Sequence, residues 1–523
     1  MRLLGIALAF MLSAPWLAAC DDDAVSQARR QTLIIGKASG LSTIDPGATV
    51  MAYNFAPMSL SYERLLRFAV ADGSPTGAVE GELAESWRLD DDGKSWLFTL
   101  KQNHRFDDGS LVTAAAVRFS FLRTLRLGLG PAQALSGLED VEAIDARTVR
   151  FRLAAPSPIF PLILALPPMV VINPTVLAHQ KGDDLARAWL SEHTAGSGPY
   201  RVASWERGQR IVLKPNPYAA ETPRYFQKIV LKTVKDNASR RLLLERGDID
   251  IFEGVTPDMA DKVAQMSGVA LFERPTPVIV ALAMNTTRAP FTDIRVRQAI
   301  SLAIDRRAIA SGVVHGHASL VNGVLPAGIP GHDPDLPEVR RDLSAARALL
   351  KEAGIAPGME FTLSYVPASA TVDSTALAIQ NQLADAGLKI RLETLAPSAF
   401  AKVLAGDFDL TLSNWSADFP DPWPIMQFAY HSSNAGEGYN LSRYANAEVD
   451  GLLARAEHTM DAAERTALYE QAQRIVMAEE PMVNLFAVHG LLAYRADVRG
   501  LLYNAWQPGI YNVESMYRGD DAP

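Results

Sequence analysis

The chain has 523 residues, of which 48% are hydrophobic and 21% charged, and its formal net charge is −9. This is the composition of an ordinary globular protein of several domains, and it offers no broad basic surface of the kind that nucleic-acid binding requires. Beyond the first 20 residues, no stretch approaches the roughly 20 apolar residues that a membrane-spanning helix needs.

The N-terminus has the pattern of an export signal. Met1-Arg2 supplies a positive charge, a mostly apolar run follows, and small residues lead to Cys20, the only cysteine of the chain. A lone cysteine cannot form an internal disulfide. The tetrapeptide Leu17-Ala18-Ala19-Cys20 resembles a bacterial lipobox. It predicts a signal peptide over 1–19, a lipid on Cys20 and a tether over 20–30. The alternative, a cytosolic protein with a chance cysteine, requires position, spacing and uniqueness to coincide.

The next elements are strands and hairpins. Thr32–Lys37 is a short apolar run rich in β-branched residues, which predicts a buried strand. An Asp-Gly turn between apolar runs predicts a hairpin over 87–100, and a strand, a turn and a second strand are expected over 141–153. Between them, Thr113 is placed to cap a helix. The stretch from about 67 to 195 is therefore rich in hairpins.

The second half of the chain alternates strands and helices. We expect a helix over 236–246 that ends at Gly247, and another that begins at Asp293. A helix over 371–386 precedes a strand, and a further strand is expected over 408–412. Such alternation over about 286–484 is typical of a largely parallel sheet, so the predicted fold class is mixed α/β.

No catalytic constellation is evident. Gly196-Ser197-Gly198 has Ala195 where a nucleophile elbow needs glycine, so a tight turn is the better interpretation. His315 and His317 share the spacing of one strand face and could bind a metal, but the sequence offers no third ligand. A polar loop is favoured. The prediction is a protein that is not an enzyme and has no cofactor or metal; an exported hydrolase is the disfavoured alternative.

Six segments, taken in order, resemble family 5 solute-binding proteins, the extracytoplasmic receptors of peptide and nickel ABC importers. Each is weak alone, but the ordered set covers nearly all of the chain after Cys20. The segments are LAESW at 83–87 with the region up to FSF; GSGPYRVASWERGQRIVLKPNPYA at 196–219; MNTTRAPFTDIRVRQAISLAIDRRAI at 284–309; ARALLKEAG at 346–354; NWSADFPDPW at 414–423; and YANAEVDGLLARA at 444–456.

The resemblance implies a two-lobed periplasmic-binding-protein fold of type II, cluster C, with an extra domain. Crossing strands near Ala283 and Phe486 would form the hinge between the lobes. The implied boundaries are lobe I over 31–66, 197–285 and 485–523, the hairpin-rich extra domain II over 67–196, and lobe III over 286–484.

The resemblance also implies a peptide site between the lobes. Asp418 matches the position whose carboxylate takes the peptide ammonium, and Trp415 would wall a side-chain pocket. Backbone groups of Asn414, Ser416 and Ala417 would pair with an extended peptide, as in strand addition. From its own sequence Asp418 also fits a proline-rich turn, where Asp421 and Pro422 would shape the chain.

Across the cleft, Met51, Ala52 and Tyr53 resemble the second peptide-pairing stretch of the family; a loop packed on the lobe surface is the alternative. No arginine is assignable to a peptide carboxylate, which favours oligopeptides over dipeptides. Relatives take nickel chelates, haem, glutathione or sugars, so a non-peptide cargo is the alternative.

The implied partners are the peptide and the transmembrane subunits of an ABC permease, with no nucleic acid. The chain is expected to be a monomer in the periplasm, held to the membrane by its lipid. Asp21 resembles the inner-membrane retention signal of some Gram-negative lipoproteins.

Overall fold

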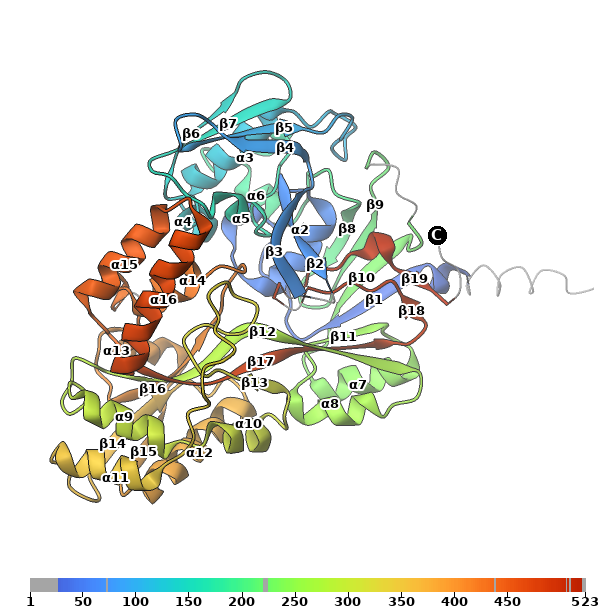
Figure 1. The fold of residues 1–523 in the computed structure, drawn as a ribbon. Coiled ribbons are helices and arrows are strands. Elements are labelled where there is room, and N and C mark those ends of the chain that lie inside the picture. Colours follow the sequence, from blue (N-terminus) through green and yellow to red (C-terminus); the bar gives the residue numbers. More distant parts are fainter. Residues whose placement is uncertain are drawn as a thin grey trace, which may run out of the picture.

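A computed structural model describes residues 27–71, 74–219, 224–436, 439–504, 506–507 and 509–519. Strands and helices alternate in a mixed α/β fold (Figure 1). Within the described ranges, no helix has the length and apolar character needed to cross a bilayer. The predicted signal peptide, Cys20 and Asp21 lie outside these ranges.

In the described part of the chain, one sheet has 11 strands, and β12 and β17 occupy its centre. On one side of this central pair lie β16, β14 and β15, and on the other β11, β1, β10, β9 and β8. β13 pairs with β17. In chain order the strands are β1 (Thr32–Lys37), β8 (Tyr200–Glu206), β9 (Arg210–Pro215), β10 (Lys228–Thr233), β11 (Ile251–Glu253), β12 (Val269–Met284), β13 (Ala318–Leu320), β14 (Glu360–Tyr365), β15 (Lys389–Thr394), β16 (Leu410–Trp415) and β17 (Met482–Arg495).

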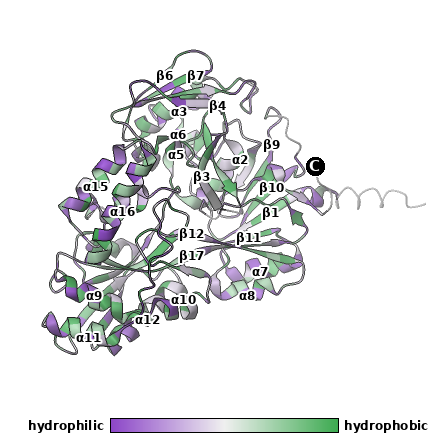
Figure 2. Ribbon diagram, in the orientation of Figure 1, coloured by the Kyte–Doolittle hydropathy of each residue, from purple (hydrophilic) through white to green (hydrophobic). Residues whose placement is uncertain are grey.

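The alternation of side chains along β12 explains how two groups of helices cover its C-terminal half. Leu282 and Met284 belong to one buried core, and Ile279, Ala281 and Ala283 to another, because successive residues of a strand point to opposite faces. The first core includes residues of α9 (Ile294–Ala303), α10 (Arg306–Val313), α11 (Leu343–Glu352) and α12 (Ala370–Asp385). The second includes residues of α14 (Trp423–Tyr430), α15 (Ala447–His458) and α16 (Ala462–Glu479). Helices such as α11 and α15 carry both hydrophilic and hydrophobic residues (Figure 2).

The hairpin-rich stretch builds a separate antiparallel sheet of four strands in the order β4-β5-β7-β6. These are β4 (Ala84–Leu89), β5 (Ser95–Leu100), β6 (Leu138–Ala143) and β7 (Thr148–Leu153), and α3 (Ala114–Leu127) packs on them. Phe151 lies at the centre of their core, with its ring edge-on to Phe98 and Phe121 at 5.6 and 5.0 Å. This unit has its own hydrophobic core.

Shorter elements connect these layers. They are α2 (Phe55–Ser61), α4 (Gly130–Gln133), α5 (Phe160–Leu164), α6 (Arg187–Leu190), α7 (Asn237–Arg246), α8 (Pro257–Ala264), α13 (Ala401–Leu404), the hairpin of β2 (Leu66–Ala71) and β3 (Ser74–Gly81), the pair β18 (Val498–Arg499) and β19 (Tyr517–Arg518), and 3-10 turns at Pro46–Ala48, Ala52–Asn54, Pro174–His179, Pro397–Phe400, Ser432–Asn434 and Val513–Ser515.

Local signals in the sequence located most boundaries. Thr113 and Asp293 cap α3 and α9 through their side chains, and Gly247 ends α7 in the left-handed conformation at φ 77°. One prediction was displaced: the strand expected over 408–412 lies at Leu410–Trp415. Its register follows β12, since Leu410 pairs with Met284 and Trp415 with Ile279. This shift brings the strand up to the segment in which Asp418 lies.

Candidate functional site

β16 has a free edge beside the predicted site. Its whole length pairs with β12, but on its other side β14 reaches only Leu410 and Thr411. In the described part of the chain, no strand pairs with that side of residues 412–415. Immediately beyond, the backbone groups of Ser416 and Ala417 form no hydrogen bond with another described residue. An extended chain laid along this edge would therefore find unused donors and acceptors.

Asp418 follows this edge and has no partner of its own. Its carboxylate forms no hydrogen bond and no ion pair with any residue in the ranges that the structure describes. The residue is exposed, yet desolvation by the surrounding protein raises the pKa of its carboxyl. Exposure and a raised pKa are compatible if the side chain lies in a recess. Solvent then still reaches the carboxylate, but protein replaces much of the water around it. A carboxylate in that setting gains from a cation.

The segment that carries Asp418 joins two hydrophobic cores. Ala417 is fully buried in the core of α14–α16, whereas Phe419 is buried in the core of the hairpin-rich unit. Trp423 packs against both cores and stacks on Phe419 with their ring centroids 6.5 Å apart. Asp418 therefore lies where the hairpin-rich unit meets the helices beside β16.

Trp415 and Ser413 also carry unused polar atoms near this edge. The Trp415 indole N–H and the Ser413 hydroxyl are both buried, and neither has a hydrogen-bond partner among the described residues. Asn414 and Ser416, which flank Trp415, are exposed. Because a buried donor without a partner costs free energy, the Trp415 N–H favours a ligand or water at this position.

A buried ion pair holds the turn after Asp418 in place. Asp421 accepts two hydrogen bonds from Arg465 of α16, at 2.6 and 2.7 Å, and both residues are buried. Asp421 also accepts a hydrogen bond at 2.8 Å from the backbone N–H of Trp423, the first residue of α14. This confirms that Asp421 shapes the turn. Arg465 also lies over the ring of Tyr469, with its guanidinium carbon 5.0 Å from the ring centroid. No local signal pointed to Arg465, because it lies 44 residues away in the chain.

Met51, Ala52 and Tyr53 do not form an extended strand. Ala52–Asn54 is a 3-10 turn, in which the Met51 carbonyl accepts from the Asn54 N–H at 2.9 Å. The Met51 N–H donates to the Thr49 hydroxyl, so both of its backbone groups are used within the loop. The Met51 backbone is thus hydrogen-bonded within its own loop, and peptide pairing by residues 51–53 stays a prediction. The side chains of Met51 and Tyr53 stay exposed, at 50% and 38%.

The two histidines have different surroundings. His315 is exposed in a left-handed conformation at φ 54°, whereas His317 is only partly exposed and donates toward Glu273. Among the described residues, no group of three His, Cys, Asp or Glu side chains is placed to hold a metal ion.

The tight turn expected at 196–198 is not formed: residues 196 and 197 have no turn, and the chain only bends at 198–199 before β8. A Cβ on Gly196 or Gly198 would lie 2.1 or 2.5 Å from the backbone of Ser61, so only glycine fits this close approach. Ser197 between them is buried, and its hydroxyl has no hydrogen-bond partner in the described chain. A nucleophilic serine needs a base at hydrogen-bond distance, which Ser197 lacks.

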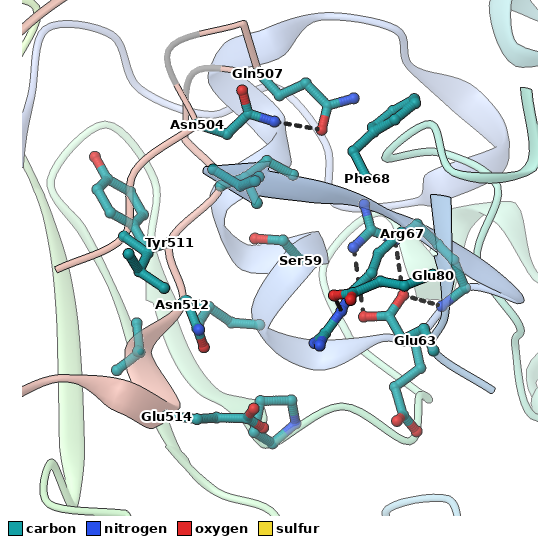
Figure 3. A pocket seen from close by; sticks show the side chains of 18 of the residues that line it. Ser59, Glu63, Arg67, Phe68, Glu80, Asn504, Gln507, Tyr511, Asn512 and Glu514 are labelled. Atoms are coloured by element: carbon teal, nitrogen blue, oxygen red, sulfur yellow. Dashed lines mark hydrogen bonds and ion pairs between the residues drawn. The ribbon is translucent and has the colours of Figure 1, made fainter. Parts of the chain in front are cut away.

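A cavity of about 450 Å³ lies elsewhere (Figure 3). It is bounded by α2, the β2–β3 hairpin and the segment 502–514, and none of the predicted site residues lines it. Most of its charged side chains pair with one another: Arg64 with Glu82, Arg67 with Glu80, and His104 with Glu63. Because these charges need no ligand to be satisfied, we take the free carboxylate of Asp418 and not the cavity as the candidate site.

Comparison with known proteins gives consistent results. A family model described as bacterial extracellular solute-binding proteins, family 5 Middle, matches residues 78–437. The probable D,D-dipeptide-binding periplasmic protein DdpA of Escherichia coli K12 is 36% identical over 488 residues, which cover 93% of this chain and 94% of that protein.

Two solved structures share the fold. The periplasmic binding protein DppA of Helicobacter pylori, in complex with the peptide STSA, has a TM-score of 0.79 at 23% identity and covers 95% of this chain and 100% of its own. NikA of Brucella suis, in complex with Fe(III)-EDTA, has a TM-score of 0.82 at 22% identity and covers 93% and 99%.

Proposed function

The chain belongs to family 5 of the bacterial extracellular solute-binding proteins, and we propose that it captures peptides for an ABC importer by their charged amino terminus. The observation that carries the proposal is the free, desolvated carboxylate of Asp418 beside the open edge of β16. A peptide ammonium there would form a charge-assisted hydrogen bond, and the peptide backbone would lie along residues 414–417. Trp415 would wall the adjoining pocket. This mode of binding reads features common to all peptides.

The amino end of the cargo is better specified than its length. A relative at 36% identity is named for D,D-dipeptides, which supports short peptides and cargo that contains D-residues. The lack of an assignable arginine for the carboxylate end supports longer ones. The proposal therefore specifies a free amino terminus and leaves the carboxyl end open, so that oligopeptides and dipeptides are both substrates to be compared.

Native mass spectrometry of the purified protein tests the cargo class. We expect a mixture of co-purified peptides that all have free amino termini, and competition by synthetic peptides of two to about five residues in both stereochemical series. A single non-peptide ligand that peptides do not displace would contradict the proposal.

We propose that capture closes two lobes about the central strands. The lobes are those expected from the sequence, with lobe I over 31–66, 197–285 and 485–523, lobe III over 286–484, and the extra domain over 67–196. β17 supports this division because its residues 492–494 pair with β11, whereas residues 486–488 pair with β13. β12 runs beside β17 and pairs on its other edge with β16 over residues 279–284. Their pairing is interrupted between Pro275 and Ile279, which is a suitable place for a hinge.

The membrane anchor gives a separate prediction. Changing Cys20 to serine removes the thiol that would carry diacylglycerol, so the protein should move from the membrane fraction to the soluble periplasmic fraction. Fractionation of cells followed by immunoblotting measures this. A matched change of Ser26 to alanine in the tether should leave the protein in membranes; a Cys20→Ser protein that stays membrane-bound would contradict the anchor. The permease partner, the monomeric state and retention at the inner membrane by Asp21 belong to the same proposal.

A further inference from the structure

Two histidines share one carboxylate at the point where the central strands change neighbours. Glu273 lies on β12 just before the interruption in its pairing with β17, and His489 lies on β17 opposite that interruption. His317 precedes β13, which pairs with β17 at residues 486–488. Because β12 and β17 are the strands that connect the two halves of the sheet, contacts here affect how one half is held relative to the other.

The hydrogen bonds of this histidine cluster connect three segments. One carboxylate oxygen of Glu273 accepts from Nδ1 of His317 at 3.0 Å and from Nδ1 of His489 at 2.6 Å. The backbone N–H of His489 also donates to the backbone carbonyl of His317 at 3.1 Å. The far nitrogen of His489, Nε2, lies 2.9 Å from the Ser319 hydroxyl. The turn before β13 is thus tied to both central strands.

The two rings differ at their second nitrogen. With Nδ1 protonated, Nε2 of a neutral imidazole is an acceptor. His489 has the Ser319 hydroxyl there as a donor, but Nε2 of His317 is buried without a hydrogen-bond partner among the described residues. The Nε2 atom of His317 lies 3.8 Å from a carboxylate oxygen of Asp261 on α8. In the neutral ring both of these atoms are hydrogen-bond acceptors, so neither can donate to the other. A proton on Nε2 would turn this into an attractive contact.

Several charged or titratable side chains surround His317. Glu273 and Asp261 supply two carboxylates, His489 lies on the other side of Glu273, and the Arg274 side chain is directed at the Glu273 carbonyl. Burial acts to raise the pKa of Glu273, but the hydrogen bonds from His489 and His317 outweigh it and the pKa lies below its ordinary value. Glu273 thus stays ionised through the range in which histidines titrate, and its contribution is lost only as the pH falls through that lowered pKa.

We propose that His317 is a pH-sensitive tie between the turn at 314–317 and the β12–α8 side of the sheet, and that acidification strengthens it. A second proton on the ring gives His317 ion pairs with both Glu273 and Asp261, and these pairs hold the two halves of the sheet more firmly together. If peptide capture requires these halves to move, external pH regulates capture; that last step rests on the proposed function.

Hydrogen–deuterium exchange of the ligand-free, full-length protein tests the tie. Amides of residues 314–320 and 486–490 are compared between the wild type and His317→Gln at each pH, so that the pH dependence of chemical exchange cancels. We expect exchange about threefold slower in the wild type at about pH 5.5 and nearly equal exchange at about pH 8. The proposal would be overturned if the ratio of the exchange rates of His317→Gln and the wild type were the same at both pH values.

Two further variants separate the tie from general destabilisation. His315→Asn changes the neighbouring exposed histidine, tolerates the left-handed conformation, and should retain the wild-type response. Asp261→Asn changes a side chain that is 74% exposed, so it should fold normally and reduce the acid response. The assignment would be contradicted if His315→Asn lost the slowing of amide exchange at acidic pH. It would also be contradicted if the single variants Asp261→Asn and His317→Gln both kept that slowing in full. No peptide is present, so failure here leaves the peptide proposal untouched.

Discussion

Replacing Asp418 with asparagine is expected to weaken binding of peptides with a free amino terminus by about 100-fold, which corresponds to about 3 kcal/mol. Asparagine keeps the size of the side chain but removes the charge that would neutralise the ammonium. The same peptides with an acetylated amino terminus should bind the two proteins within about threefold of each other, because they present no cation. Isothermal titration calorimetry on matched peptide pairs measures both.

Two further results distinguish this role from a structural one. In the ligand-free protein the pKa of Asp418 is raised, so the folded state is favoured by its protonation and loses that stability as the pH rises through the raised pKa. Asp418→Asn should therefore stabilise the ligand-free protein at neutral pH. Peptide affinity should fall as the pH drops through the same pKa, since a neutral carboxyl cannot pair with an ammonium.

The ligand role of Asp418 would be contradicted if Asp418→Asn lost equal affinity for free and acetylated peptides. The control variant is Asp407→Asn, which changes a side chain that is 75% exposed.

Changing Arg465 to methionine is expected to lower the free energy of unfolding by about 3 to 5 kcal/mol. The substitution leaves the Asp421 carboxylate buried without its two hydrogen bonds, whereas methionine roughly keeps the packing of the arginine stem. Because Asp421 holds the turn after Asp418, peptide affinity should fall as well. Urea unfolding followed by tryptophan fluorescence measures stability, and calorimetry measures affinity.

The double variant Asp421→Asn with Arg465→Met supplies the decisive comparison. It removes the buried charge, so it should recover part of the stability that Arg465→Met loses. Arg455→Met, at an exposed position on the neighbouring helix α15, should change stability by less than about 0.5 kcal/mol. A loss below about 1 kcal/mol for Arg465→Met would mean that the pair does not stabilise this segment.

Sequence alone located the elements whose signals are local. Thr113 and Asp293 cap helices through side-chain hydrogen bonds to residues at most three positions away, and Gly247 supplies a left-handed helix end that other residues adopt at a cost. The ordered set of segments also sufficed to identify the family, because each segment is read from neighbouring residues. The ligand role of Asp418 was predicted in this way, from its position in NWSADFPDPW.

Only the tertiary structure decided the features that depend on residues far apart in the chain. Arg465 reaches Asp421 across 44 residues, and Glu273 meets His489 across 216. Nothing in the neighbourhood of either partner indicates the pairing. The register of β16 was likewise set by β12, about 130 residues earlier, and the turn at Met51 by hydrogen bonds within a packed loop. Such contacts form because folding brings together polar groups that burial would otherwise leave unpaired, and that requirement acts on the whole fold.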